Sequence, residues 1–141
     1  MDVATFKKQP IMGILRGVTL EQIEPLIEAV IASGLKALEI TMNTTDAGQI
    51  IRKAVKIAKK RLMLGAGTVL DGESLGLAID SGATFIVTPV LIKDVLSYCL
   101  KHKIPVFPGA LTPQEIYQAF KAGATMVKVF PAKVFGPQYF Q

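Results

Sequence analysis

The sequence of 141 residues contains one cysteine, one histidine and no tryptophan. A single cysteine, Cys99, excludes a disulfide within the chain and is typical of a reducing cytoplasm. Cys99 lies on the apolar face of an expected helix, so we interpret it as a core residue. His102 follows at the end of the same helix, where a surface position is a better explanation than a catalytic role. These scarcities leave other residue types to carry any chemistry.

Long apolar runs are also missing, although half of the residues are hydrophobic and the mean hydropathy is +0.42. No run approaches the ~18 residues that a membrane-spanning helix needs, and the first ten residues lack the apolar region of a signal peptide. The length predicts one domain over residues 1–141. The net charge of +5 suits small anionic ligands, and we interpret the basic clusters as solvated helix ends rather than a nucleic-acid surface.

Short apolar runs recur along the chain, and amphipathic segments long enough for helices separate them. This alternation predicts strand–helix units on a parallel sheet that is covered on both faces. The expected fold is a (β/α)₈ TIM barrel of which about six units are present, and the alternative is an open doubly wound sheet. The periodicity does not separate these two. The apolar runs are residues 11–15, 35–40, 62–64, 84–87, 104–107 and 125–130.

Helix boundaries have local signals. A Thr-x-x-Gln capping box at Thr19 predicts a helix over 19–33 that stops at Gly34. Thr112, followed by Pro113 and by a glutamate three residues on, predicts another helix that ends at Gly123. Residues 47–60 and 91–102 have the same helical pattern, and residues 135–141 are expected to begin a further helix.

Three ionisable residues interrupt or end the apolar strands: Arg16, Glu39 and Lys128. An unpaired charge in a buried strand costs several kcal/mol, so these residues need a structural or a functional reason. A buried ion pair, or strand ends that reach solvent, is the structural explanation. The functional one is that all three lie near the carboxyl ends of parallel strands, where barrel enzymes place their active sites.

The chemistry of these three side chains is complementary. An apolar surrounding and a second cation favour the neutral form of the Lys128 amine, which is the form that attacks a ketone to give a Schiff base. Glu39 is able to accept and return protons. The Arg16 guanidinium is suited to hold a carboxylate through two hydrogen bonds.

Glycine and proline mark the expected strand ends. Gly65-Ala66-Gly67-Thr68 follows the third apolar run, and we interpret it as a tight turn whose N–H groups and hydroxyl are available to an oxygen-rich ligand. Thr88-Pro89 and Phe107-Pro108-Gly109 end the fourth and fifth runs. We interpret them primarily as turns and secondarily as part of a pocket wall.

Several motifs together resemble those of bacterial class I aldolases that act on 2-keto-3-deoxy-6-phosphogluconate (KDPG) and 4-hydroxy-2-oxoglutarate (KHG). The resemblance runs the whole length of the chain, and its specificity comes from the order and spacing of the motifs. They are residues 13–17 (GILRG), 38–41 (LEIT), 65–69 (GAGTV), 104–109 (IPVFPG), 127–132 (VKVFPA) and 135–138 (FGPQ).

This resemblance implies a (β/α)₈ barrel, a homotrimer, and no metal or organic cofactor. It implies a small anionic 2-keto acid as substrate, with no nucleic acid or membrane partner. By motif position, Lys128 corresponds to the Schiff-base lysine and Glu39 to the general acid/base. The other implied positions are Thr68 at the pyruvyl part of the substrate, Arg16 as a pocket cation, and Pro89 and Phe130 as pocket wall.

Two departures qualify the resemblance. Asn43 stands where better-known members have an arginine that helps to hold the substrate carboxylate, and some relatives that act on phosphogalactonate share this asparagine. The chain also contains six strand–helix units where the family has eight. We therefore expect a shortened chain, or a part of a longer one, that carries the catalytic pair without the family's phosphate site.

Four hypotheses remain open from the sequence. The leading one is a lyase that cleaves KDPG to pyruvate and glyceraldehyde 3-phosphate, or KHG to pyruvate and glyoxylate. The second keeps the Schiff base but prefers 2-keto-3-deoxy-6-phosphogalactonate or the unphosphorylated substrate. The third is a non-catalytic α/β domain in which Lys128 and Glu39 form a buried ion pair. The fourth is an inactive fragment.

Overall fold

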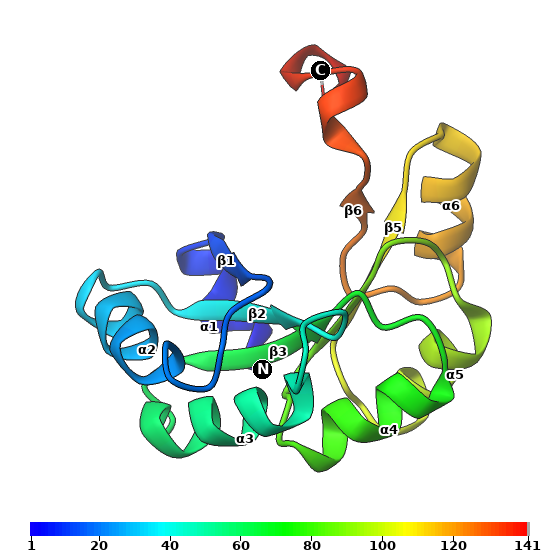
Figure 1. Ribbon diagram of the computed structural model, residues 1–141. Helices are drawn as coiled ribbons and strands as arrows, with labels where there is room; N and C mark the ends of the chain where they lie inside the picture. Colours follow the sequence, from blue (N-terminus) through cyan, green and yellow to red (C-terminus); the bar gives the residue numbers. More distant parts are fainter. Residues whose placement is uncertain (141) are drawn as a thin grey trace.

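A computed structural model describes residues 1–140, and six parallel strands form its centre (Figure 1). The strands pair in chain order, each with the next, from the first to the last. Each of the six apolar runs therefore overlaps a strand, as predicted. The strands are β1 (Met12–Leu15), β2 (Ala37–Thr41), β3 (Met63–Gly67), β4 (Ile86–Thr88), β5 (Val106–Ala110) and β6 (Lys128–Val129).

The arrangement is a half-barrel. A doubly wound sheet reverses its strand order at a switch point and carries helices on both faces, whereas here the order is sequential. Helices α2 to α5 lie in an arc along the outer face of the curved sheet (Figure 1). The structure thus excludes the open doubly wound alternative for the described residues.

The helices follow the predicted pattern with shorter bounds. Thr112 caps α6 through the expected capping box with Glu115, and Gly34 and Gly123 have positive φ where α2 and α6 end. The predicted start of the first long helix is wrong: α2 begins at Ile23, and residues 20–22 form a turn. One half of the predicted capping box is present, because the Gln22 side chain accepts a hydrogen bond from the Thr19 N–H at 3.0 Å. The helices are α1 (Val3–Lys8), α2 (Ile23–Ala32), α3 (Ala47–Ala58), α4 (Gly72–Asp80), α5 (Lys93–Lys101) and α6 (Pro113–Lys121).

Apolar side chains form two separate clusters, one on each face of the sheet. The larger cluster lies between the sheet and the outer helices, and it includes Ile40, Ile50 and Cys99, each with no exposed surface. The smaller one contains Phe85 and Phe107 with several methionines on the inner face. The outer cluster holds the scaffold together, and the inner face is left with room for other residues.

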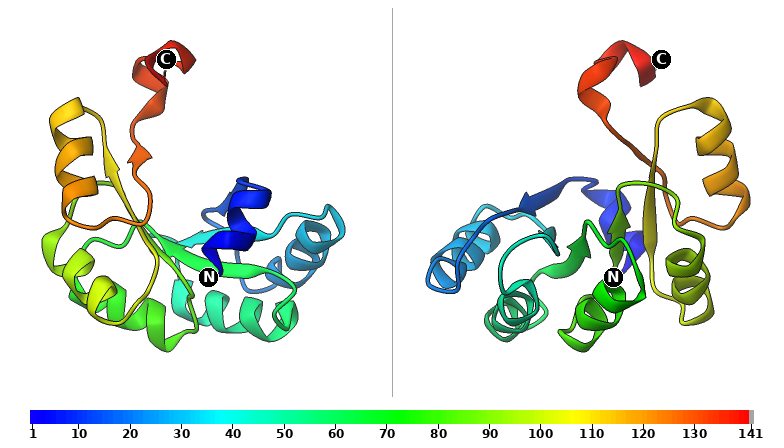
Figure 2. Two further views of the ribbon diagram at one scale, coloured as in Figure 1. Left: turned by 180° about the vertical axis from the view of Figure 1, so that it is seen from behind. Right: turned by 45° about the vertical axis from the view of Figure 1, so that its right-hand side comes forward.

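Helix α1 was not predicted, and it lies on the opposite face of the sheet from α2 to α5 (Figure 2). Its Phe6 is buried among inner-face residues. The Met1 ammonium donates a hydrogen bond to the carbonyl of Thr84, just before β4, at 2.9 Å. Helix α1 therefore lies near the amino ends of the strands, and the carboxyl ends remain open.

The edge strands depart from the expectation of a sheet covered on both faces. Strands β2 and β5 are buried throughout, but β1 and β6 are only partly buried, and Ile14 is 52% exposed. After β6 the chain forms two 3₁₀ turns, Ala132–Val134 and Pro137–Phe140, in an arm that projects from the body (Figure 1). The helix predicted over residues 135–141 is thus a short 3₁₀ turn, with Gln141 outside the described residues. Across residues 1–140, every helix is too short or too polar to cross a bilayer.

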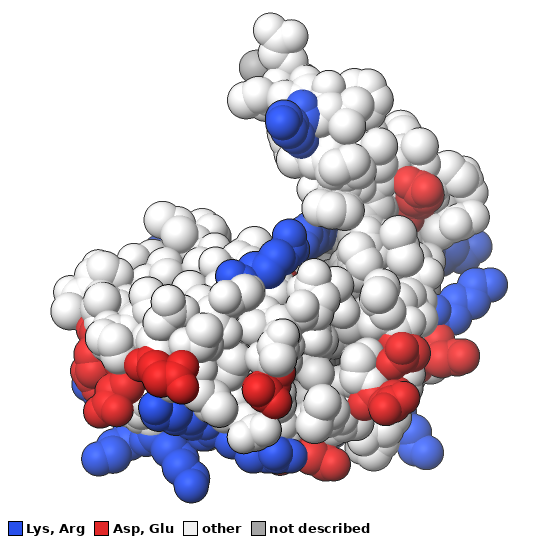
Figure 3. All heavy atoms as spheres, in the orientation of Figure 1, with Lys and Arg blue, Asp and Glu red and all other residues white. Residues whose placement is uncertain are grey.

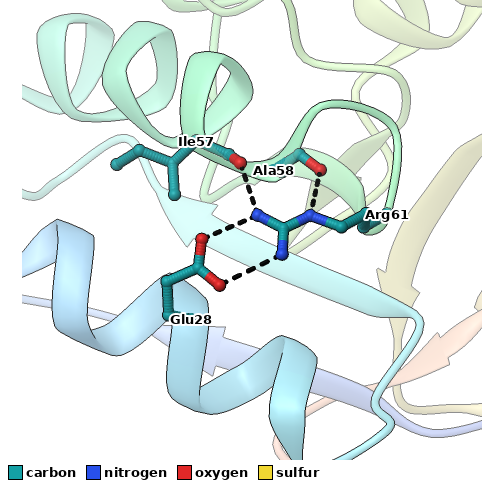
Figure 4. A network of polar contacts seen from close by, with 4 residues as sticks. All are labelled: Glu28, Ile57, Ala58 and Arg61. Atoms are coloured by element: carbon teal, nitrogen blue, oxygen red, sulfur yellow. Dashed lines mark hydrogen bonds and ion pairs between the residues drawn. The ribbon is translucent and has the colours of Figure 1, made fainter.

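One ion pair ties two outer helices together (Figure 4). The Arg61 guanidinium contacts both carboxylate oxygens of Glu28 on α2, at 2.6 and 3.1 Å, and donates to the carbonyls of Ile57 and Ala58 at the end of α3. Both side chains are about half exposed, so solvent weakens their attraction. The pair therefore adds little to the free energy of unfolding. It is the only ion pair among residues 1–140.

Candidate active site

Glu39 is the most unusual side chain of the sheet. It is the middle residue of β2, it is 2% exposed, and no residue among 1–140 gives its carboxylate a hydrogen bond. Burial raises the pKa of Glu39 above its ordinary 4.5, while the positive charges of Lys128 and Arg16 act in the opposite direction. A carboxyl group with a raised pKa is suited to exchange protons near neutral pH.

Two glycines of β3 make room on the inner face. A methyl group added at Gly67 would overlap the carboxylate of Glu39, and one added at Gly65 would overlap the ring of Phe85. The side chains of the neighbouring strands therefore lean over β3, which has no inner side chain at these two positions. The expectation that Gly65 to Gly67 form a turn after the strand is wrong. They are the end of β3, where they permit this close approach.

Lys128 shares a cavity with Glu39. The cavity has a volume of about 250 Å³, and five strands and α1 contribute to it. Although both residues line it, the only ion pair of residues 1–140 lies elsewhere, so the Lys128 amine and the Glu39 carboxylate are not in direct contact. The described residues thus lack the buried ion pair of the structural explanation. The other lining residues are Phe6, Met12, Ile14, Val87, Phe107, Met126 and Val127.

The sheet positions Lys128 at the edge of this cavity. Lys128 is the first residue of β6 and is in register with Gly109 of β5, which has no side chain. Its ammonium lies 5.1 Å from the centre of the Phe130 ring, a distance at which a cation is attracted to an aromatic face. Phe130 is 44% exposed, so the lysine lies between an apolar wall and solvent.

Arg16 and Thr68 lie at the carboxyl ends of their strands without lining the cavity. Arg16 follows β1 and is exposed, but its charge acts on Glu39. Thr68 has φ +56°, which is rare for a β-branched residue and costs free energy. Hydrogen bonds from Met42 N to Gly67 O at 2.7 Å and from Val69 N to Val87 O at 3.3 Å hold this segment on both sides.

The remaining predicted residues are near the same end of the sheet, but the structure does not bring them into the cavity. Asn43 is exposed in the loop between β2 and α3, and Pro89 is partly buried directly after β4. A second hollow of about 360 Å³ opens at the start of α3, beside Met42, Thr44 and Arg52. It contains none of the residues predicted for catalysis.

The sequence interpretation missed the residues that shape the site. Position 67 has to be glycine because the Glu39 carboxylate lies against it. Phe6 lines the cavity because the N-terminal helix α1 closes one end of the inner face. The alternation of side chains along β3 was the available signal for Gly67, because it places residues 63, 65 and 67 on the same face as Glu39. The basic pair at residues 7 and 8, interpreted as a solvated helix end, lies in the last turn of α1.

Charged side chains are unevenly distributed over the visible surface. In Figure 3, acidic and basic side chains alternate over the outer helices, whereas Lys and Arg atoms lie in the hollow between the body and the projecting arm. The ionic groups that this view shows in the hollow are therefore cationic.

Nowhere in residues 1–140 do three metal-binding side chains come together.

A parallel half-barrel with a lysine and a buried carboxyl group in one cavity defines a site of the kind used by Schiff-base enzymes. The family model described as "Aldolase: KDPG and KHG aldolase" matches residues 3–140. The chain belongs to the KDPG and KHG aldolase family, as the sequence motifs indicated.

Individual relatives agree with this assignment. A 2-dehydro-3-deoxy-6-phosphogalactonate aldolase of Escherichia coli is 36% identical over 134 residues, which is 95% of this chain and 65% of the relative. A solved structure described as native KDPGal superimposes with a TM-score of 0.88 at 36% identity, covering 94% of this chain and 64% of that one. A Legionella pneumophila KDPG aldolase, with pyruvate captured as a covalent carbinolamine, has a TM-score of 0.83 at 28% identity, covering 92% and 63%. The chain thus spans just under two thirds of the length of these relatives.

Replacing Gly67 by alanine tests the close approach of Glu39. The added methyl group would overlap the carboxylate, so we expect Gly67→Ala to lower the free energy of unfolding by about 1–3 kcal/mol, as overpacking does. Urea unfolding followed by circular dichroism measures this. The control is Gly76→Ala in α4, where a methyl group meets nothing within 4 Å. A Gly67→Ala protein as stable as the unmodified one would contradict the account of β3.

The raised pKa of Glu39 predicts a pH-dependent stability. Between 4.5 and its raised folded value, folded Glu39 keeps a proton that the unfolded chain has released, so its contribution to stability is lost as the pH rises through this window. Glu39→Gln does not ionise. The free energy of unfolding of Glu39→Gln minus that of the unmodified protein should therefore increase with pH from about 4.5 upward and then level off. Urea titrations at a series of pH values measure it, with Glu24→Gln, an exposed position on α2, as the control.

Proposed function

We propose that this chain carries the catalytic pair of a class I aldolase that cleaves KDPG to pyruvate and glyceraldehyde 3-phosphate. The observation that carries the proposal is that Lys128 and Glu39 line one cavity without forming an ion pair. A lysine and a carboxyl group held in this way leave space between them for a substrate. The family to which the chain belongs supports the reaction class.

The proposed reaction begins with the neutral Lys128 amine, which attacks the C2 ketone to give a carbinolamine and then, with loss of water, a Schiff base. Glu39 takes the proton of the C4 hydroxyl, directly or through a water, and the C3–C4 bond breaks. Its electron pair moves to the Schiff base as an enamine, and glyceraldehyde 3-phosphate leaves. Protonation of the enamine at C3 and addition of water release pyruvate and the free amine.

The other predicted residues receive roles in substrate binding. Arg16 is proposed to hold the carboxylate of the 2-keto acid, because its charge already reaches the cavity at Glu39. The Phe130 ring beside the lysine amine is proposed as apolar wall, together with Pro89. Thr68, held in a strained conformation, is proposed to contact the pyruvyl part of the substrate, and Asn43 its more distant part.

A second substrate is favoured by a specific observation. The chain is 36% identical to a phosphogalactonate aldolase, and some relatives of that type share the asparagine that this chain has at position 43. We therefore expect measurable cleavage of both KDPG and 2-keto-3-deoxy-6-phosphogalactonate, and of unphosphorylated KHG to pyruvate and glyoxylate. Assays of pyruvate release from the three substrates side by side decide the preference. Cleavage of none of them by the folded protein would contradict the proposed activity.

The architecture and the setting of the protein belong to the same proposal. We infer that the half-barrel is part of a single (β/α)₈ domain, since its six strands follow the sequential order of such a barrel. Assembly as a homotrimer and catalysis without a metal or organic cofactor follow from the family resemblance. A cytoplasmic location is supported by the single buried cysteine.

Borohydride reduction in the presence of pyruvate tests the role of Lys128. The reduced Schiff base is stable, so mass spectrometry of proteolytic fragments should place one pyruvyl adduct on Lys128. Lys128→Met should abolish the adduct, because the side chain keeps a similar length without an amine. The control is Lys101→Met, which replaces an exposed lysine at the end of α5. This variant should form the pyruvyl adduct on Lys128 to the same extent as the protein with the original sequence. An unmodified Lys128 in a protein that circular dichroism shows to be folded would exclude the Schiff-base function.

A further inference from the structure

A pair of buried hydroxyl groups connects two loops at the carboxyl ends of the strands. The Thr44 hydroxyl accepts a hydrogen bond from the backbone N–H of Gly17 at 3.1 Å, and it lies 3.1 Å from the hydroxyl of Thr41. Thr44 is 5% exposed and Thr41 is not exposed at all. Buried hydroxyl groups are costly unless they are hydrogen-bonded, so this connection is a defined part of the fold.

The loop that carries Thr44 is itself fixed. Thr44 N donates to Thr41 O at 3.0 Å, and Ala47 N donates to Thr44 O at 3.1 Å, so two successive turns join β2 to α3. Met42 N donates to Gly67 O of the neighbouring strand at 2.7 Å. The backbone of the loop that carries the Thr44 hydroxyl is therefore fixed by hydrogen bonds to β2, to β3 and to the start of α3.

The loop that receives the hydrogen bond carries Arg16. Strand β1 ends at Leu15, Arg16 is exposed, and Gly17 has φ +66°. Among residues 1–140, Arg16 forms no ion pair, although its charge acts on Glu39. A long exposed side chain keeps its direction only when its backbone is fixed, because it has many rotamers. The Gly17 N–H, one residue beyond Arg16, is the nearest point at which the backbone is tied to another loop.

From this geometry we propose that Thr44 is a positioning residue, whose hydroxyl holds the loop after β1 so that Arg16 faces the carboxylate of the 2-keto acid. Thr44 does not line the cavity that Lys128 and Glu39 share. It acts through the Gly17 N–H on Arg16. The inference rests on the proposed function, and it adds a residue that the sequence motifs had not singled out.

A positioning role predicts a loss of affinity rather than of chemistry. Thr44→Val keeps the shape and removes the acceptor of the Gly17 N–H. We expect the pyruvate concentration for half-maximal borohydride-trapped adduct to rise about fivefold to tenfold, the effect of misplacing one hydrogen-bonding group. The rate of adduct formation at saturating pyruvate should stay within about twofold. Thr44→Ser keeps the hydroxyl and should behave like the unmodified protein.

A double-mutant cycle shows whether the effect passes through Arg16. Arg16→Gln alone should raise the half-saturating concentration of pyruvate, and adding Thr44→Val to it should raise it little further, since interacting positions are non-additive. The control is Thr125→Val, because the Thr125 hydroxyl also accepts a backbone N–H, that of Val106, at 3.1 Å. This contact lies at the amino end of β5, away from Arg16, and its loss should leave pyruvate binding unchanged.

The possible failures are distinguishable. If the unmodified protein forms no adduct on Lys128, the proposed function fails and this inference fails with it. If the adduct forms but Thr44→Val binds pyruvate normally, or its effect simply adds to that of Arg16→Gln, only the positioning role is overturned. Should Thr44→Val not fold, Thr44→Ala carries the test, because it also removes the hydroxyl that accepts the Gly17 N–H. A normal response to pyruvate in Thr44→Ala would then overturn the inference.

Discussion

A buried carboxyl group in a parallel strand is the constraint on which the rest of the site depends. Glu39 is 2% exposed, and such burial without a direct partner is costly for a charged group. The molecule accommodates it by removing side chains from the adjacent positions of β3, by raising the pKa of the carboxyl group, and by placing two cations nearby but not in contact. Each of these features fits the proton-transfer role proposed for Glu39.

The two faces of the sheet divide stability from chemistry. Outer helices and β-strands share a continuous apolar cluster, which fixes the strands and their register. The inner face carries a small cluster of aromatic and methionine side chains toward one end and the cavity of Lys128 and Glu39 beside it. The loops at the carboxyl ends are then joined to each other through Thr44, so that the exposed residues of the site are tied to the buried ones.

The sequence predicted the elements of this fold better than their details. Short apolar runs located all six strands, because a parallel strand covered by helices must be apolar, and the charges at 39 and 128 then indicated two residues that the structure brings into one cavity. It did not show that Gly65 and Gly67 belong to the strand, since glycine is equally typical of turns. Nor could it separate a half-barrel from an open sheet, because both have the same periodicity. The Thr44–Gly17 connection joins two loops that are far apart in the sequence and has no local signal.

The most direct test of the account is a crystal structure of the protein after borohydride reduction with pyruvate. The account predicts a covalent bond from the Lys128 Nζ to C2 of the former pyruvate, inside the cavity that Glu39 lines, with the pyruvyl carboxylate facing Arg16. It also predicts that the Thr44 hydroxyl still accepts the Gly17 N–H. An unmodified Lys128 in a direct ion pair with Glu39, with no density for pyruvate between them, would contradict it and identify the pair as structural.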